Sequence, residues 1–266
     1  MHKNGKAAKT VEIVRKPIVP GSWHGRDARK MALKRFFAFL GITLIYLIAG
    51  TFFSFDALWA RILSTVVIVG CLAYYQYAVG AAKGEKDASY GEIIYSRRES
   101  GHAVDAARSF HRGKGFFAAL VGCAPYVLFA LVFALIAQKT TYRLGALPAW
   151  TESMMHQTEF SAGLAYYGNQ PGMSAVDVMR VIDRAIIFPF IGIVSPMGAE
   201  AALWMEPLSP LLVLVVPVWY GAGYAQGLNY RARVNTGIKM GDEKKKRRES
   251  KARRQRQRSK TPERLI

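Results

Sequence analysis

The sequence contains four uncharged, mostly apolar stretches that are each long enough to cross the core of a lipid bilayer. They cover residues 36–55, 62–82, 116–137 and 208–228. An α-helix rises about 1.5 Å per residue, so about 20 apolar residues span the hydrocarbon core. A helix also satisfies its own backbone hydrogen bonds in lipid. The pattern therefore predicts an all-α, multi-pass integral membrane protein with four transmembrane helices.

Basic side chains flank this apolar region on both sides and predict its orientation. Residues 231–266 contain 15 Lys and Arg against four Asp and Glu, and residues 1–35 contain ten more Lys and Arg. Basic segments next to membrane spans are retained in the cytoplasm, which is the positive-inside rule. We therefore expect both termini to be cytoplasmic, an even number of crossings, and a location in the cell membrane.

The same distribution of charge divides the chain into three regions. Residues 36–230 are the predicted helical membrane domain. Residues 1–35 are predicted to be a mostly disordered basic arm, with a basic helix that begins over residues 27–35 and runs into the membrane. Residues 231–266 are predicted to be a disordered basic tail because they carry too little apolar surface to fold alone, with Glu249–Arg258 able to become helical on a partner. Within the polar loop between the second and third spans, Tyr90–Glu99 and His102–Phe110 have helical patterns.

The segment before the last span, residues 185–205, has an ambiguous pattern. It has only 15 uncharged residues in a row and contains Pro189 and Pro196. A full crossing here would place the basic tail outside. We therefore predict a re-entrant or interfacial helical segment on the outer side, packed among the spans, because irregular backbone at membrane depth must be covered by protein or water. Six crossings, with another span inside residues 138–184, is the alternative.

Charged residues around this segment form the first candidate site. Charged groups near the membrane are costly unless they are paired or hydrated, and for this reason they often line an ion or substrate path. A polar outer vestibule is one interpretation, and a simple boundary with outer water before the last span is the other. The candidate residues are Glu200, Glu206, Arg180, Asp183 and Arg184.

The basic tail is the second candidate site. Each basic residue near an anionic membrane contributes about 1 kcal/mol of attraction, so the tail predicts contact with anionic lipid head groups of the bilayer. Another membrane or cytoplasmic protein, or RNA such as that of a ribosome, is a further candidate partner. No aromatic residue follows Tyr230, which disfavours sequence-selective reading of RNA. The predicted contact residues are Lys244, Lys245, Lys246, Arg247, Arg248, Arg253, Arg254, Arg256 and Arg258.

Two glycines of the last span, Gly223 and Gly227, lie one helical turn apart. This spacing lets another helix approach closely, first within the chain and second between copies.

The sequence carries no motif of a serine hydrolase or a zinc protease. Its two cysteines lie in apolar stretches, which argues against a disulfide framework or a zinc site. We therefore expect a non-enzymatic accessory or scaffold component that contacts anionic lipid or a cytoplasmic partner through its tail, with no cofactor and no catalytic or metal-binding residues. The alternative is a small transporter or transporter subunit with a polar outer vestibule near Glu200 and Glu206.

Overall fold

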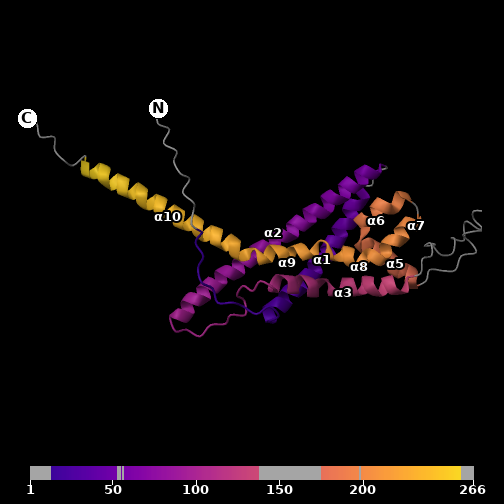
Figure 1. Cartoon of the computed structure of the whole chain (residues 1–266), viewed down its shortest axis with the longest axis horizontal. Coiled ribbons are helices and arrows are strands. Elements are labelled where there is room, and N and C mark those ends of the chain that lie inside the picture. The colour runs from indigo at the N-terminus through magenta and orange to yellow at the C-terminus, as the bar shows by residue number, and fades with distance from the viewer. Residues whose placement is uncertain (1–12, 53–54, 56, 138–174, 198, 259–266) are drawn as a thin grey trace, which may run out of the picture.

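The computed structural model describes residues 13–52, 55, 57–137, 175–197 and 199–258, and all regular elements in these ranges are helical (Figure 1). The elements are α1 Arg26–Phe52, α2 Leu58–Glu99, α3 Lys114–Ile136, α5 Ala175–Ile186, α6 Phe188–Val194, η2 Ser195–Met197, α7 Ala199–Met205, η3 Glu206–Leu208, α8 Ser209–Leu214, α9 Pro217–Ala225 and α10 Gly227–Arg258.

Four helical segments of the described chain are long and apolar enough to cross a membrane. They are Arg26–Phe52, Leu58–Glu99, Lys114–Ile136 and Ala201–Ala225. Many large apolar side chains on these segments point outward, and Leu135 is 78% exposed. Such a surface is favourable in lipid and unfavourable in water. The all-α, four-span prediction is confirmed to this extent.

The four candidate spans lie side by side and alternate in direction (Figure 1). α2 packs on α9, α1 packs on α3, and α3 also packs on α8 and α9. The starts of α1 and α3 and the ends of α2 and α9 lie together at one end, here called the basic end. Helices α5, α6 and α7 lie at the other end, here called the opposite end (Figure 1).

The loop predicted after residue 82 is wrong over residues 83–89, because α2 continues without a break to Glu99. Residues 83–99 contain no proline, and the ion pair of Lys83 with Asp87, one turn apart, supports the helix. Tyr90–Glu99 is therefore helical, as the end of α2. The predicted helix His102–Phe110 is absent from the structure, since its backbone forms turns.

The last candidate span begins earlier than predicted and is bent. It starts at Ala201 instead of residue 208, so the end of the segment 185–205 belongs to it. Each of its pieces η3, α8 and α9 begins with a proline in its first two positions, and proline removes a backbone N–H. Val215 and Val216 keep helical backbone angles, so α8 and α9 form one kinked helix. The rest of the segment 185–205 forms the short helices α6 and η2 and the start of α7.

The helix expected over residues 27–35 is present as the start of α1, and the rest of both basic arms is more ordered than the sequence predicted. Residues 13–25 have no regular structure but lie against the bundle: the Val19 amide donates to the Gly91 carbonyl, and the Gly21 amide donates to the Phe110 carbonyl. Residues 227–258 form the single helix α10. Low hydrophobicity predicted disorder there, but Lys, Arg, Glu, Gln and Ala are good helix formers and no proline interrupts them.

Candidate functional site

Three residues of the predicted vestibule, Glu206, Arg180 and Arg184, form a buried ion-pair cluster at the opposite end. The Glu206 carboxylate is 3.1 Å from Arg180 Nε and 2.7 Å from a terminal nitrogen of Arg184. Glu206 and Arg180 are 2% and 1% exposed. Arg180 also lies 3.8 Å from Asp177 and over the ring of Phe133. Two guanidinium groups therefore neutralise Glu206 and hold α5 against η3.

Helix α5 buries two charged side chains and exposes three apolar ones. Arg180 and Asp183 are buried, whereas Val178, Val181 and Ile182 are exposed. In a water-soluble protein an amphipathic helix has the reverse arrangement. A polar interior with an apolar exterior is the arrangement that lipid favours.

Asp183 lies in the same region and has no ion-pair or hydrogen-bond partner among the described residues. Burial raises its pKa to about 7, the charge of Glu206 acts in the same direction, and Ser209 and Arg184 oppose the change. The Ser209 hydroxyl is near enough to influence the carboxylate, yet its geometry falls short of a hydrogen bond. A pKa near 7 leaves the Asp183 carboxyl partly protonated at neutral pH.

The structure thus brings together four of the five residues of the predicted vestibule. Glu206, Arg180 and Arg184 form one ionic cluster, and Asp183 lies buried on the same helix as the two arginines. Glu200 lies in α7, but its side chain is outside the described part of the structure. Glu206 itself lies within the last candidate span and not before it, and its carboxylate is closed off from solvent.

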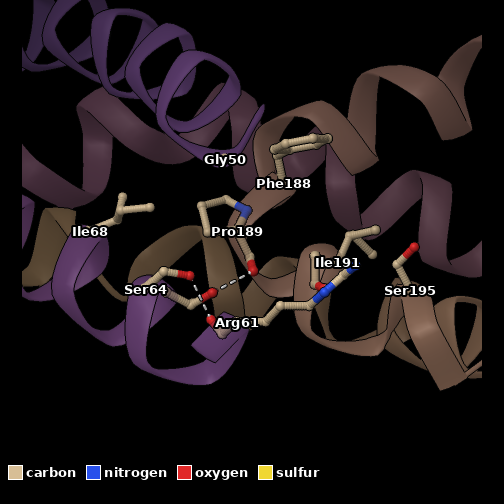
Figure 2. A pocket seen from close by; sticks show the side chains of 10 residues that line it. Gly50, Arg61, Ser64, Ile68, Phe188, Pro189, Ile191 and Ser195 are labelled. Atoms are coloured by element: carbon tan, nitrogen blue, oxygen red, sulfur yellow. Dashed lines mark hydrogen bonds between the residues drawn. The ribbon is translucent and has the colours of Figure 1, made fainter. Parts of the chain in front are cut away.

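A small cavity of about 130 Å³ lies between α1, α2 and α6 (Figure 2). Arg61 of α2 donates a hydrogen bond of 3.1 Å to the Gly192 carbonyl. In a regular helix that carbonyl would accept from residue 196, which is a proline without an N–H. Thr65 donates to the Pro189 carbonyl at 2.9 Å. These bonds fix α6 on α2, so the cavity walls have a structural role.

Gly223 and Gly227 lie where α9 and the start of α10 touch α2. A Cβ atom on Gly223 would collide with the Tyr77 carbonyl, and one on Gly227 would collide with the backbone of Gly84. The two backbones therefore approach as closely as glycine allows. The structure places both glycines in a contact within the chain.

At the basic end, a buried lysine that the sequence reasoning missed joins three helices. Lys114, at the start of α3, is fully buried and lies 2.6 Å from Asp27 of α1 and 3.4 Å from Asp87 of α2. The Tyr224 hydroxyl of α9 donates to the same Asp87 carboxylate at 2.7 Å. The only signal in the sequence was a charged residue directly before an apolar stretch, which also occurs at many solvated helix ends.

A second ionic network fixes the first turns of α10 to α2. Arg231 contacts Glu92 at 2.8 Å and Glu85 at 3.2 Å, and the Asn235 amide donates to Glu92 at 2.6 Å. The hydrogen bond to Glu92, the largest influence, raises the pKa of Arg231 further above its usual range. Thr236 accepts a hydrogen bond from the Val14 amide, so the N-terminal segment joins the same contact.

Beyond Thr236, α10 leaves the bundle. Every residue from 237 to 256 is exposed. This part, residues 237–258, is called the arm here; it carries 11 Lys and Arg against three Asp and Glu. It includes all the predicted contact residues of the tail, although the side chain of Arg258 lies outside the described part.

Comparison with known protein families, with curated proteins and with solved structures gives no match for this chain. No group of three or more His, Cys, Asp or Glu in the described part is arranged to hold a metal ion.

Proposed function

We propose that the protein is a non-enzymatic membrane scaffold whose arm recruits an acidic cytoplasmic partner. The observation that carries this proposal is that one helix combines a base fixed to the bundle with an exposed, strongly basic end. The contacts of Arg231 and Asn235 with α2 fix the base of α10, while residues 237–256 are all exposed.

The direction of the arm supports a cytoplasmic partner over the lipid of the protein's own membrane. α10 leaves the bundle at the basic end and extends away from the candidate spans (Figure 1). A helix of 22 residues is about 33 Å long. Charge interactions in physiological salt decay over about 8 Å. The distal cations of a projecting arm therefore lie beyond the reach of the bilayer surface.

The composition of the arm favours recognition of an extended negative charge. Its basic side chains occupy all faces of the helix, and between Asp242 and Arg258 it has no large apolar residue to insert into a bilayer or a hydrophobic groove. Binding by such a surface depends on charge density, and salt weakens it. An acidic protein surface and an RNA backbone both provide this charge density.

Purification from native membranes in mild detergent, followed by identification of bound protein, lipid and RNA, tests the proposal. One variant replaces the nine predicted contact residues of the arm by Gln. A matched control exchanges Lys and Arg at the same nine positions and keeps the charge. We expect a cytoplasmic partner with the wild type and the control, its loss with the Gln variant, and its release by salt.

Treatment with nuclease before purification distinguishes the two partner classes. A nuclease-resistant partner is a protein, and a nuclease-sensitive partner is RNA. The same bound molecules with all three chains, or a difference only in anionic lipid, would contradict the proposal.

The transporter alternative gains no support from its key residue. Glu206 is buried and bound by Arg180 and Arg184, so its carboxylate is already neutralised. Reaching an ion or a substrate would require this cluster to separate, at the cost of leaving buried charges unpaired.

A further inference from the structure

A cavity of about 480 Å³ opens at the basic end, between α1, α2, the turn before α3, and α9. Its volume lies within the usual range of small-ligand sites. Six basic and two acidic side chains line it, an excess of four positive charges. The basic residues are Lys30, Lys34, Arg35, Lys83, Lys86 and Arg108.

The two acidic residues in the lining are already neutralised from within the protein. Asp27 pairs with the buried Lys114, which stands behind the cavity wall. Asp87 pairs with Lys114 and with Lys83, and it also accepts a hydrogen bond from Tyr224. The acids therefore do not compensate the remaining cations, and the cavity is more positive than its composition alone indicates.

The other basic side chains are either unpaired or fixed in place by neutral groups. Lys30, Lys34, Lys86 and Arg108 form no ion pair with any described residue. Arg35 donates a hydrogen bond of 3.0 Å to Gln76, and its guanidinium lies 4.3 Å from the centre of the Tyr220 ring. Neither contact neutralises Arg35, but together they hold its guanidinium in position. A guanidinium held in this way loses little entropy when it binds an anion.

The cavity lies at the level where the apolar surface begins. Lys34 and Arg35 directly precede the apolar stretch 36–55, and Lys83 directly follows the stretch 62–82. Met31 and Val79 add apolar surface to the lining. Basic cavities between transmembrane helices at this level are suited to phosphate-bearing head groups.

We propose that this cavity binds a phosphate group, carried either by an anionic lipid head group or by a soluble phosphate compound. Lys34, Lys86 and Arg108 contact the phosphate oxygens, and Arg35 provides a fixed guanidinium. Phosphate suits the site because it accepts several charge-assisted hydrogen bonds at once. This site is distinct from the arm, so it goes beyond the proposed function: no residue of 237–258 lines the cavity.

Binding to the full-length protein in nanodiscs tests the proposal in two experiments, one for each source of phosphate. In the first, nanodiscs of phosphatidylcholine contain added phosphatidylglycerol, and retained lipid is measured by native mass spectrometry. In the second, nanodiscs of phosphatidylcholine alone are titrated with inorganic pyrophosphate, and binding is measured by calorimetry. Retention of phosphatidylglycerol assigns the site to a lipid head group, and binding of pyrophosphate assigns it to a soluble compound.

Two triple variants distinguish binding in the cavity from a general effect of positive charge on binding. The cavity variant is Lys34→Gln with Lys86→Gln and Arg108→Gln. The control is Arg97→Gln with Arg98→Gln and Arg112→Gln, which removes the same charge from exposed positions at the same end that do not line the cavity. We expect at least about tenfold weaker binding in the cavity variant, since each charged hydrogen bond contributes about 1.5 kcal/mol or more. The control should change binding by less than about threefold.

A charge-preserving variant distinguishes the loss of charge from a general effect of substitution on folding. Lys34→Arg with Lys86→Arg keeps both charges and should retain binding to within about threefold. Equal weakening in the cavity variant and the control, or no binding of either ligand to the wild type, would overturn the proposal. The Gln variant of the arm should bind both ligands as the wild type does, because the arm does not line the cavity. The proposal for the arm and the proposal for the cavity can therefore fail independently of each other.

Discussion

The helical bundle and the arm use charged residues in opposite ways. In the bundle, Lys114, Arg180 and Glu206 are buried and paired, and each joins separate helices. In the arm, 11 basic residues are crowded into 22 positions, and residues 237–256 are all exposed. A buried charge must be paired, so it supports the fold, whereas an exposed charge costs little to leave free and stays available to a partner. The comparison shows that the role of a charged residue depends on its burial and its partners and not on its residue type.

The largest expected difference between the two regions is the effect of removing an acidic residue. Glu206→Ala leaves Arg180 buried without its closest partner, and breaking a buried pair costs about 3–5 kcal/mol of folding free energy. Glu243→Ala in the exposed arm should cause no measurable change. Thermal unfolding in the same detergent compares the two variants. Similar melting temperatures would show that the ionic cluster at the opposite end does not support the fold.

Two glycines provide the next comparison. Gly223→Leu forces a side chain into the Tyr77 backbone and should destabilise the protein by about 3 kcal/mol, because neither backbone can retreat without losing other contacts. Gly237 lies in the arm with open space around it, so Gly237→Leu should leave stability unchanged or slightly higher. Unfolding measured by tryptophan fluorescence in denaturant distinguishes them. Loss of stability in Gly237→Leu would mean that the arm packs on the bundle.

A smaller effect comes from Asp183, and it depends on pH. Burial is the main reason that its pKa is about 7, against 3.8 in a model compound, so the folded state binds this proton more tightly than the unfolded state does. The stability that Asp183 contributes is complete below about pH 4 and is lost as the pH rises to about 7. Asp183→Asn removes this dependence.

The melting temperature of Asp183→Asn relative to the wild type should therefore be higher at pH 8 than at pH 5. The difference in unfolding free energy between the two proteins should change by on the order of 2 kcal/mol between pH 5 and pH 8. Asp242→Asn in the arm serves as the matched control and should show no such change. A difference that is constant between pH 5 and pH 8 would place Asp183 in a solvated environment.

The sequence predicts the four apolar helices because their signal is local. A run of more than 20 uncharged residues such as 116–137 has one stable form in lipid. The start and the end of α3 each lie within two residues of the predicted boundaries. Residues 185–205 were also separated from the regular spans because of their prolines and short apolar run, but Ala201–Met205 belong to the last candidate span. The prediction of a regular span over 208–228 rested on its apolar length alone and did not consider Pro217, at which α9 begins.

The ionic clusters were harder to predict, because their members meet only in three dimensions. Arg180 and Glu206 were assigned to one site from proximity in the sequence. Lys114, Asp27 and Asp87 lie on three different helices, and no local pattern connects them. The arm was predicted to be disordered because its residues bury nothing, yet helix propensity and the fixed first turns of α10 allow a helix without burial.

A measurement of the arm's distance from the bilayer tests the central claim most directly. In a Cys71→Ala background, a fluorophore on Ser250→Cys reports the arm, and one on Leu135→Cys reports an exposed apolar position of a candidate span. Both proteins are placed in nanodiscs that contain anionic lipid, with either a lipid-attached nitroxide or aqueous iodide as the quencher. The account predicts that the lipid quencher acts on position 135 alone and that iodide acts on position 250. Strong quenching of position 250 by the lipid nitroxide would show that the arm lies on the membrane, and it would contradict recruitment of a partner away from the bilayer.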